Sequence, residues 1–385
     1  RHTRSCILSR GLGDVYKRQP STWKWSLAWD QFFDIGNSRD YRFSIDLLYS
    51  DVKDAPYWTD LRRERIGTAA DGRPIYGALG CADQSSDPIA DCREIPNWDI
   101  LMTTDGGGSS LAATVSLAKF WDLGNGGDLN FSIAYTKTDA KTKSDALSST
   151  PTSLIGREQT FDRNNTLVGR SSFEISDRLI SNITWRKDWG QSMASTLSFF
   201  IQYQSGKPYG YSFNAPSNAL GDTFGGNEPI DDDDTQLIYV PSGPDDPNVI
   251  FAEGFDMEGW NELLASRSCL AKYKGKIVKQ NHCTSPSSTR IDMRYVHEFK
   301  LPSGSFLGDN SIEVIFDIEN LGNLLNDEWG RVEQIGFPYT AQVVSLDRDL
   351  GPNNELIFNS FRNENYTILN SASLWKAMLG VRYRF

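Results

Sequence analysis

The residues able to do acid–base chemistry are few, and their spacing argues against an enzyme. The chain has three histidines, His2, His282 and His297, which are far apart in the sequence. A Ser-His-Asp arrangement needs a nucleophile, a base and an orienting acid within hydrogen-bond reach of one another, and no local pattern points to one. His297 falls on the apolar side of an alternating stretch and is predicted to be an anchor residue near an interface. We therefore predict neither a catalytic site nor a cofactor.

An acidic run is the sharpest concentration of charge in the chain. It consists of Asp231, Asp232, Asp233 and Asp234. Clustered carboxylates can bind Ca²⁺, so this run is a candidate metal site. Its spacing differs from that of an EF-hand, in which the ligands alternate and the loop ends in Glu. A solvated loop explains the run with fewer assumptions, and we prefer that interpretation.

The cysteines fall into two local pairs. Cys81 and Cys92 share one polar stretch, and Cys269 and Cys283 share another. Such spacing predicts two disulfides formed in an oxidising compartment. Four free thiols are the alternative. A zinc site is disfavoured because His282 is the only histidine near either pair and the chain has no CxxC motif.

Aromatic residues are frequent in the same polar stretches. Aromatic rings on loops can grip sugars, peptides or siderophores. The candidates for ligand contact are Trp58, Tyr76, Trp98, Tyr209, Tyr211 and Trp260. Loop packing and interfacial anchoring explain many such residues equally well.

An alternation of apolar and polar residues defines the elements that must position these side chains. In the last twelve residues, Trp375, Leu379 and Tyr383 lie on one face while Lys376 and Arg382 lie on the other. A period of two is typical of a β-strand with one apolar face. The same pattern predicts nine strands, at 23–33, 41–49, 111–121, 129–137, 179–189, 196–204, 290–299, 311–320 and 374–385.

The connections between these strands alternate in length. Short turns follow the first, third, fifth and seventh strands, and long segments follow the others, at 50–110, 138–177, 205–288 and 321–373. Outer-membrane barrels have short periplasmic turns and long extracellular loops. The fold class predicted is therefore all-β, an antiparallel transmembrane β-barrel with long extracellular loops in contact with outer-membrane lipid.

Composition agrees with this class. Aromatic residues make up 12% of the chain, which suits interfacial girdles, and the net charge of −11 argues against a nucleic-acid partner. No run of about 18 apolar residues is present, so no transmembrane helix is predicted.

The domain organisation follows from where the alternation begins. Residues 1–19 are basic, lack alternation and resemble translated adaptor sequence, with a disordered tail as the alternative. Residues 20–385 are predicted to be the C-terminal portion of a barrel. Nine is an odd number of strands and closed bacterial barrels use even numbers, so we expect strands upstream.

Five segments of the chain form a recognisable set. They are QSGKPYGY at 204–211, LIYVP at 237–241, RIDMR at 290–294, NLGNLLN at 320–326 followed by Trp329-Gly330, and the terminal Arg-Tyr-Arg-Phe. Together, over about residues 20–385, they resemble the barrel of TonB-dependent receptors, especially the Oar-like group. The terminal segment is similar to the signal for the barrel-assembly machinery, carried here by Tyr383 and Phe385.

The resemblance implies a 22-strand transporter in the bacterial outer membrane that takes up a scarce ligand, such as a siderophore, oligosaccharide or peptide. It also implies a plug and a partnership with the TonB complex through an N-terminal region that this sequence does not contain. The main alternative is a structural or adhesive outer-membrane barrel that binds a surface partner without transport. A passive porin and a secreted all-β lectin or hydrolase explain fewer of these features.

Overall fold

The computed structural model describes residues 20–36, 38–93, 99–214, 218–221, 236–300 and 310–385. The N-terminal segment 1–19, the acidic run at 231–234 and Trp98 therefore lie outside the described residues. Within the described ranges, no helix has the length and apolar character needed to cross a membrane.

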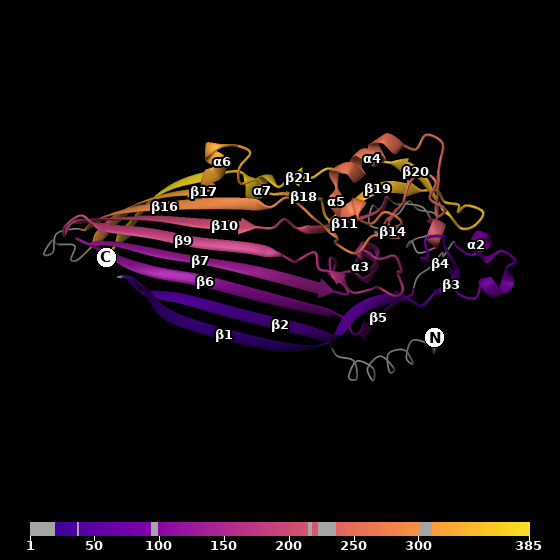
Figure 1. The fold of residues 1–385 in the computed structure, drawn as a ribbon, viewed down its shortest axis with the longest axis horizontal. Helices are drawn as coiled ribbons and strands as arrows, with labels where there is room; N and C mark the ends of the chain where they lie inside the picture. The colour runs from indigo at the N-terminus through magenta and orange to yellow at the C-terminus, as the bar shows by residue number, and fades with distance from the viewer. Residues whose placement is uncertain (1–19, 37, 94–98, 215–217, 222–235, 301–309) are drawn as a thin grey trace.

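One large antiparallel sheet dominates the molecule, and its nine long strands match the nine predicted from the sequence (Figure 1). They lie in the sheet in chain order, each paired with its neighbours in the sequence of long strands. The strands are β1 (Ser21–Ile35), β2 (Ser38–Asp60), β6 (Gly108–Gly124), β7 (Gly127–Thr142), β9 (Asp177–Asp188), β10 (Met193–Gln204), β16 (Ser288–Lys300), β17 (Ser311–Glu319) and β22 (Lys376–Arg384).

The register of the sheet joins the apolar positions of successive strands into one continuous face. Trp185 pairs with Leu197, Leu197 with Tyr295, Tyr295 with Phe316, and Phe316 with Leu379. Residues directly opposite in adjacent strands point to the same side of a sheet. Leu379 is 72% exposed, so this apolar face is largely uncovered.

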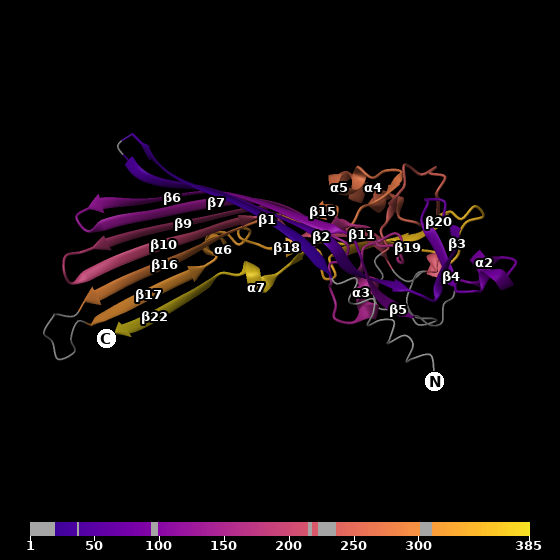
Figure 2. The same cartoon turned by 90° about the horizontal axis from the view of Figure 1, so that it is seen from below.

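The sheet has a short-turn end and a long-connection end (Figure 2). At the first, β6 and β7 are joined through Asn125 and Gly126, which have φ values of 51° and 73°. Positive φ at both central residues is the geometry of a tight hairpin turn, which suits Asn and Gly. The sheet is open, because among the described strands β1 pairs only with β2 at its edge and β22 only with β17.

The long connections form a compact unit, which we call the loop domain and define as the described residues of 61–107, 143–176, 205–287 and 333–369. Its central sheet has the order β13-β20-β19-β11-β15, with parallel as well as antiparallel pairs. These strands are β11 (Pro208–Asn214), β13 (Val249–Phe251), β15 (Cys283–Thr284), β19 (Thr340–Leu346) and β20 (Leu356–Phe361).

Short elements complete the chain. The strands are β3 (Arg63–Thr68), β4 (Pro74–Ala78), β5 (Ile100–Asp105), β8 (Gly169–Arg170), β12 (Tyr239–Val240), β14 (Lys276–Ile277), β18 (Glu333–Gln334) and β21 (Thr367–Ile368). The helices are η1 (Ala82–Gln84), α2 (Pro88–Asp91), α3 (Pro151–Arg157), η2 (Asn218–Leu220), α4 (Met257–Ser266), α5 (Ser268–Ala271), α6 (Leu321–Leu325) and α7 (Asn370–Ser373).

The loop domain has its own hydrophobic core. Trp260 on α4 is 2% exposed and packs edge-on against Phe358 and Phe361 of β20. Asp256 begins α4 by accepting a hydrogen bond from the backbone N–H of Gly259 at 2.9 Å, a side-chain cap of the helix N-terminus. The prediction of an all-β antiparallel fold is confirmed for the main sheet, but the long connections are folded structure rather than loops alone.

Candidate functional site

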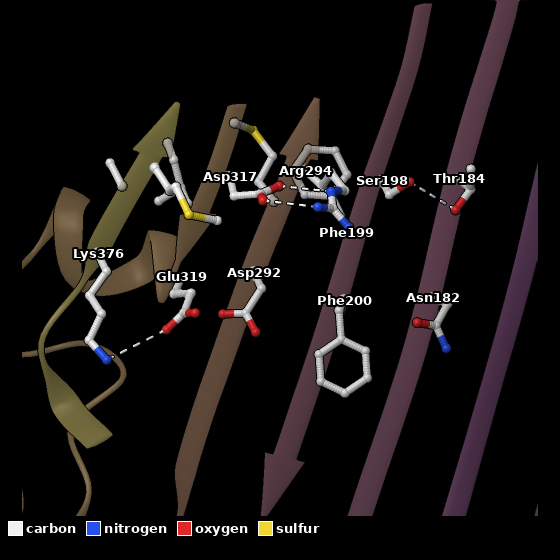
Figure 3. Close-up of a pocket in the computed structure, with 14 residues that line it drawn as sticks. Asn182, Thr184, Ser198, Phe199, Phe200, Asp292, Arg294, Asp317, Glu319 and Lys376 are labelled. Carbon is white, nitrogen blue, oxygen red and sulfur yellow. Dashed lines mark hydrogen bonds and ion pairs between the residues drawn. The ribbon is translucent and has the colours of Figure 1, made fainter. Parts of the chain in front are cut away.

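The face of the large sheet opposite the apolar one is polar and crossed by ion pairs (Figure 3). They join side chains of β9, β16, β17 and β22 that alternate with the apolar positions. The pairs are Arg186–Glu298 (3.9 Å), Arg290–Asp292 (2.8 Å), Arg290–Glu319 (3.4 Å), Arg294–Asp317 (2.9 Å), Lys376–Glu319 (3.8 Å), Arg382–Glu313 (3.4 Å) and Arg384–Glu313 (2.8 Å).

A hollow of about 520 Å³ lies on this polar face. Asn182, Thr184 and Ser198 line one side of it, and the Arg294–Asp317 pair lines the other (Figure 3). Exposed ion pairs contribute only about 0–1 kcal/mol to stability. Their chief consequence here is a wettable surface with donors and acceptors for a polar solute.

The two residues of the predicted assembly signal lie at the end of the chain, Tyr383 in β22 and Phe385 directly after it. Tyr383 lies on the apolar face, where its hydroxyl accepts a hydrogen bond from Asn310 Nδ2 at 2.7 Å. Phe385 is 99% exposed and stacks beside Tyr383 with ring centroids 6.1 Å apart. Both rings therefore remain accessible to a partner or to lipid.

The two cysteine pairs predicted from the sequence form disulfides in the structure. Cys81 and Cys92 form a disulfide beside the β3–β4 hairpin, and Cys269 and Cys283 form another that links α5 to β15. Both lie in the loop domain. Closing a loop of about 15 residues stabilises a fold by about 3 kcal/mol in the chain-entropy account, so these bonds help to stabilise the loop domain.

The predicted ligand-contacting aromatics require a correction. Tyr76, Tyr209, Tyr211 and Trp260 are buried, between 1% and 7% exposed, and cannot form an exposed platform. They are core residues of the loop domain, a role that periodicity in a polar segment does not reveal. Trp58 is half-buried on β2, where it pairs with Met102 of β5.

A cluster of two phenols and a guanidinium explains how Tyr209 is buried together with its hydroxyl. The Tyr209 and Tyr366 hydroxyls lie 3.0 Å apart, and Arg267 Nη1 donates to the Tyr366 hydroxyl at 2.9 Å. Burial raises the pKa of Tyr209 well above its usual range. The cluster holds β11 to the segment after β20 and is structural.

A second cavity, of about 390 Å³, lies within the loop domain and was not predicted from the sequence. Lys141 at the end of β7, Arg170 on β8 and the segment 272–282 contribute to its wall. No motif marks it, because its lining residues come from separate segments. Among the described residues, no group of three or more His, Cys, Asp or Glu side chains is arranged to hold a metal ion.

Glu158 is a buried carboxyl group in the loop domain, and it makes the stability of that domain depend on pH. Burial raises the pKa of this group from 4.5 to about 8, although a hydrogen bond from the Ser144 hydroxyl opposes the shift. Between these values the unfolded chain releases the proton and the folded chain keeps it. The contribution of Glu158 to stability is therefore fully present below about pH 4.5 and is lost as the pH rises through about 8.

Glu158→Gln is expected to remove this contribution to the pH dependence, because the amide is neutral at every pH. The measurement is the urea midpoint of the loop-domain transition between pH 5 and pH 8, where the variant should lose less stability than the unaltered protein. Glu253→Gln, at an exposed position, should keep the original slope. An unchanged slope in Glu158→Gln would show that this carboxyl is already ionised in the folded protein.

Comparison with protein-family models and with curated proteins finds no match for this chain.

Proposed function

We propose that the large sheet is part of the wall of an outer-membrane β-barrel, and that the protein is a receptor of the TonB-dependent type that captures a scarce ligand at the cell surface. The loop domain lies on the outer side, the short turns face the periplasm, and the polar sheet face lines the path across the membrane.

The observation that carries this proposal is the contrast between the two faces of the sheet. Leu27, Trp25 and Val381 are between 64% and 72% exposed on the apolar face, although apolar patches of this extent are rare on proteins surrounded by water. The opposite face carries the ion pairs and the hollow beside them. Lipid outside and a wettable lumen inside account for both faces.

The open edges of the sheet support a wall that continues beyond the described strands. β1 and β22 each leave one edge without a partner among the described residues. Uncovered edges of long strands are avoided in proteins, and barrels abolish them by closure. Additional strands of the same barrel would pair with both edges.

The part of the proposal that concerns TonB-driven uptake rests on the family resemblance. Two of the resembling segments have structural roles in this protein. The QSGKPYGY segment supplies the buried side chains of Tyr209 and Tyr211, and RIDMR supplies the ion pairs of Arg290 and Arg294.

If TonB drives uptake, cells producing the protein should lose uptake, but keep ligand binding, when TonB is removed. Binding without any uptake in cells with TonB would favour the adhesive barrel.

The membrane placement is tested with single cysteines at the two ends of the sheet, in a Cys6→Ser background. Asp245→Cys is in the loop domain and Asn125→Cys is in the β6–β7 turn, and both positions are exposed. A large maleimide that cannot cross the outer membrane should label Asp245→Cys in intact cells, and Asn125→Cys only after permeabilisation. Labelling of both in intact cells, or recovery of the chain away from membranes, would contradict the proposal.

A further inference from the structure

The loop-domain cavity of about 390 Å³ has the size of a small-molecule site. Apolar and aromatic groups form part of its wall, including Phe161, Leu167 and Tyr273, and no carboxylate is among its lining residues. The cavity is separate from the polar face of the large sheet.

Two hydrogen-bond acceptors in the cavity wall have no partner. Gln280 is 6% exposed, and its Oε1 makes no hydrogen bond in the described structure. Its side chain packs directly over Gly169, where a Cβ would lie 2.3 Å from Oε1. A buried polar atom without a partner costs free energy that a suitable ligand donor can recover.

His282 supplies the second acceptor. Its Nδ1 lies 2.8 Å from the carbonyl oxygen of Lys279, which can only accept, so Nδ1 carries the proton and Nε2 presents a lone pair. Nε2 is buried and without a partner among the described residues. The ring is held between Tyr211 and Tyr273, at centroid distances of 5.8 and 5.1 Å. Burial lowers the pKa of His282 to about 4, so the ring is a neutral acceptor at physiological pH.

Cationic side chains border the same cavity. Arg170 is already engaged by Glu174 at 2.8 Å, and Lys141 by Asp139 at 3.3 Å. Lys272 and Lys279 also line the cavity and are exposed, and neither forms an ion pair within the described part of the chain. The two lysines without a counter-charge favour an anionic group on a ligand. The two acceptors without a partner favour hydrogen-bond donors on the same ligand.

We infer that this cavity binds a small hydroxylated acid, whose anionic group lies against Lys272 and Lys279 while its hydroxyl donors fill Gln280 Oε1 and His282 Nε2. Sugar acids have this combination of groups. The inference deepens the proposed function by giving the receptor a ligand class, and it rests on that function only for placing the loop domain outside the cell.

The test is titration of the purified full chain with glucuronate, with glucose and acetate as matched probes that lack the carboxylate and the hydroxyls, respectively. Calorimetry should show saturable binding of glucuronate, with glucose and acetate each weaker by roughly tenfold or more. Histidine-selective ¹⁵N NMR should show a shift of the His282 Nε2 resonance, while His297 on the large sheet stays unchanged.

Matched lysine variants separate the cavity from general positive charge. Lys272→Gln with Lys279→Gln should weaken glucuronate binding by roughly tenfold, and Gln280→Met should weaken glucuronate binding while the protein stays folded. Lys274→Gln with Lys276→Gln, at exposed positions outside the cavity lining, should leave binding unchanged.

Equal affinity for glucuronate and glucose, equal loss in both lysine double variants, or absence of a His282 shift would each overturn the inference. The NMR readout uses the unaltered chain, so it decides the matter even where a variant fails to fold. The titration is performed on purified protein and is independent of the maleimide labelling, so failure of the ligand class and failure of the membrane placement are distinguishable.

Discussion

Ile183→Lys is expected to prevent stable assembly of the chain into membranes, whereas Asn182→Lys is expected to assemble like the unaltered protein. The two residues are adjacent in β9 and point to opposite faces of the sheet. Ile183 lies between Phe131 of β7 and Phe199 of β10 on the apolar face, while Asn182 lines the hollow on the opposite face.

The physical reason is the cost of placing a charge in hydrocarbon. A lysine on the lipid face of a barrel costs about 2–4 kcal/mol near the membrane midplane, and far less in a wet lumen. Ile183 is near the centre of β9 (Asp177–Asp188), where the cost should be greatest. Moving the lysine by one position along β9 is therefore expected to decide whether the protein assembles into the membrane.

The measurement is the fraction of each variant recovered in the outer-membrane fraction in a form that resists unfolding in detergent without heating. We expect most of Ile183→Lys to be lost from that fraction and Asn182→Lys to remain. If both variants assemble equally, the apolar face does not contact lipid. If Asn182→Lys is the one lost, the two faces have been assigned in the wrong sense.

Asp71→Asn is expected to destabilise the loop domain by about 3–5 kcal/mol, the usual cost of removing one partner of a buried ion pair. Asp71 and Arg73 have fully buried side chains and lie 2.7 Å apart. Arg73 also donates to the carbonyl oxygen of Leu237 at 2.9 Å and lies over the Phe213 ring. Neutralising Asp71 leaves this guanidinium buried without a counter-charge.

The measurement is the free energy of unfolding of the loop domain in urea, followed by near-ultraviolet circular dichroism of its aromatic core. Asp139→Asn is the matched control, because the Lys141–Asp139 pair has exposed side chains (52% and 64%) and should change stability by about 1 kcal/mol or less. Combining Asp71→Asn with Arg73→Met should cost less than the sum of the single changes, since the pair is removed together. Additive losses would show that the two charges do not stabilise each other.

The sequence by itself determined the nine long strands and their two faces. Alternation in segments such as Leu197–Tyr203 and Ile312–Ile318 is a local property, and a residue's face in a strand follows directly from its parity. The short spacing of Cys81 and Cys92, and of Cys269 and Cys283, likewise predicted the two disulfides that the structure contains.

Only the tertiary structure decided what the long connections do. All residues of β11 from Pro208 to Phe213 are buried, so that strand has no alternation to distinguish it from a loop, and Tyr209 and Tyr211 looked like exposed contacts. β2 continues to Asp60 because β5 pairs with its outer part, a partner about 40 residues away. The cavity bounded by Arg170, Lys272 and His282 joins segments that have no common period or motif. Burial of this kind depends on which distant segments meet, and that information lies in the packing of the whole chain rather than in any local pattern.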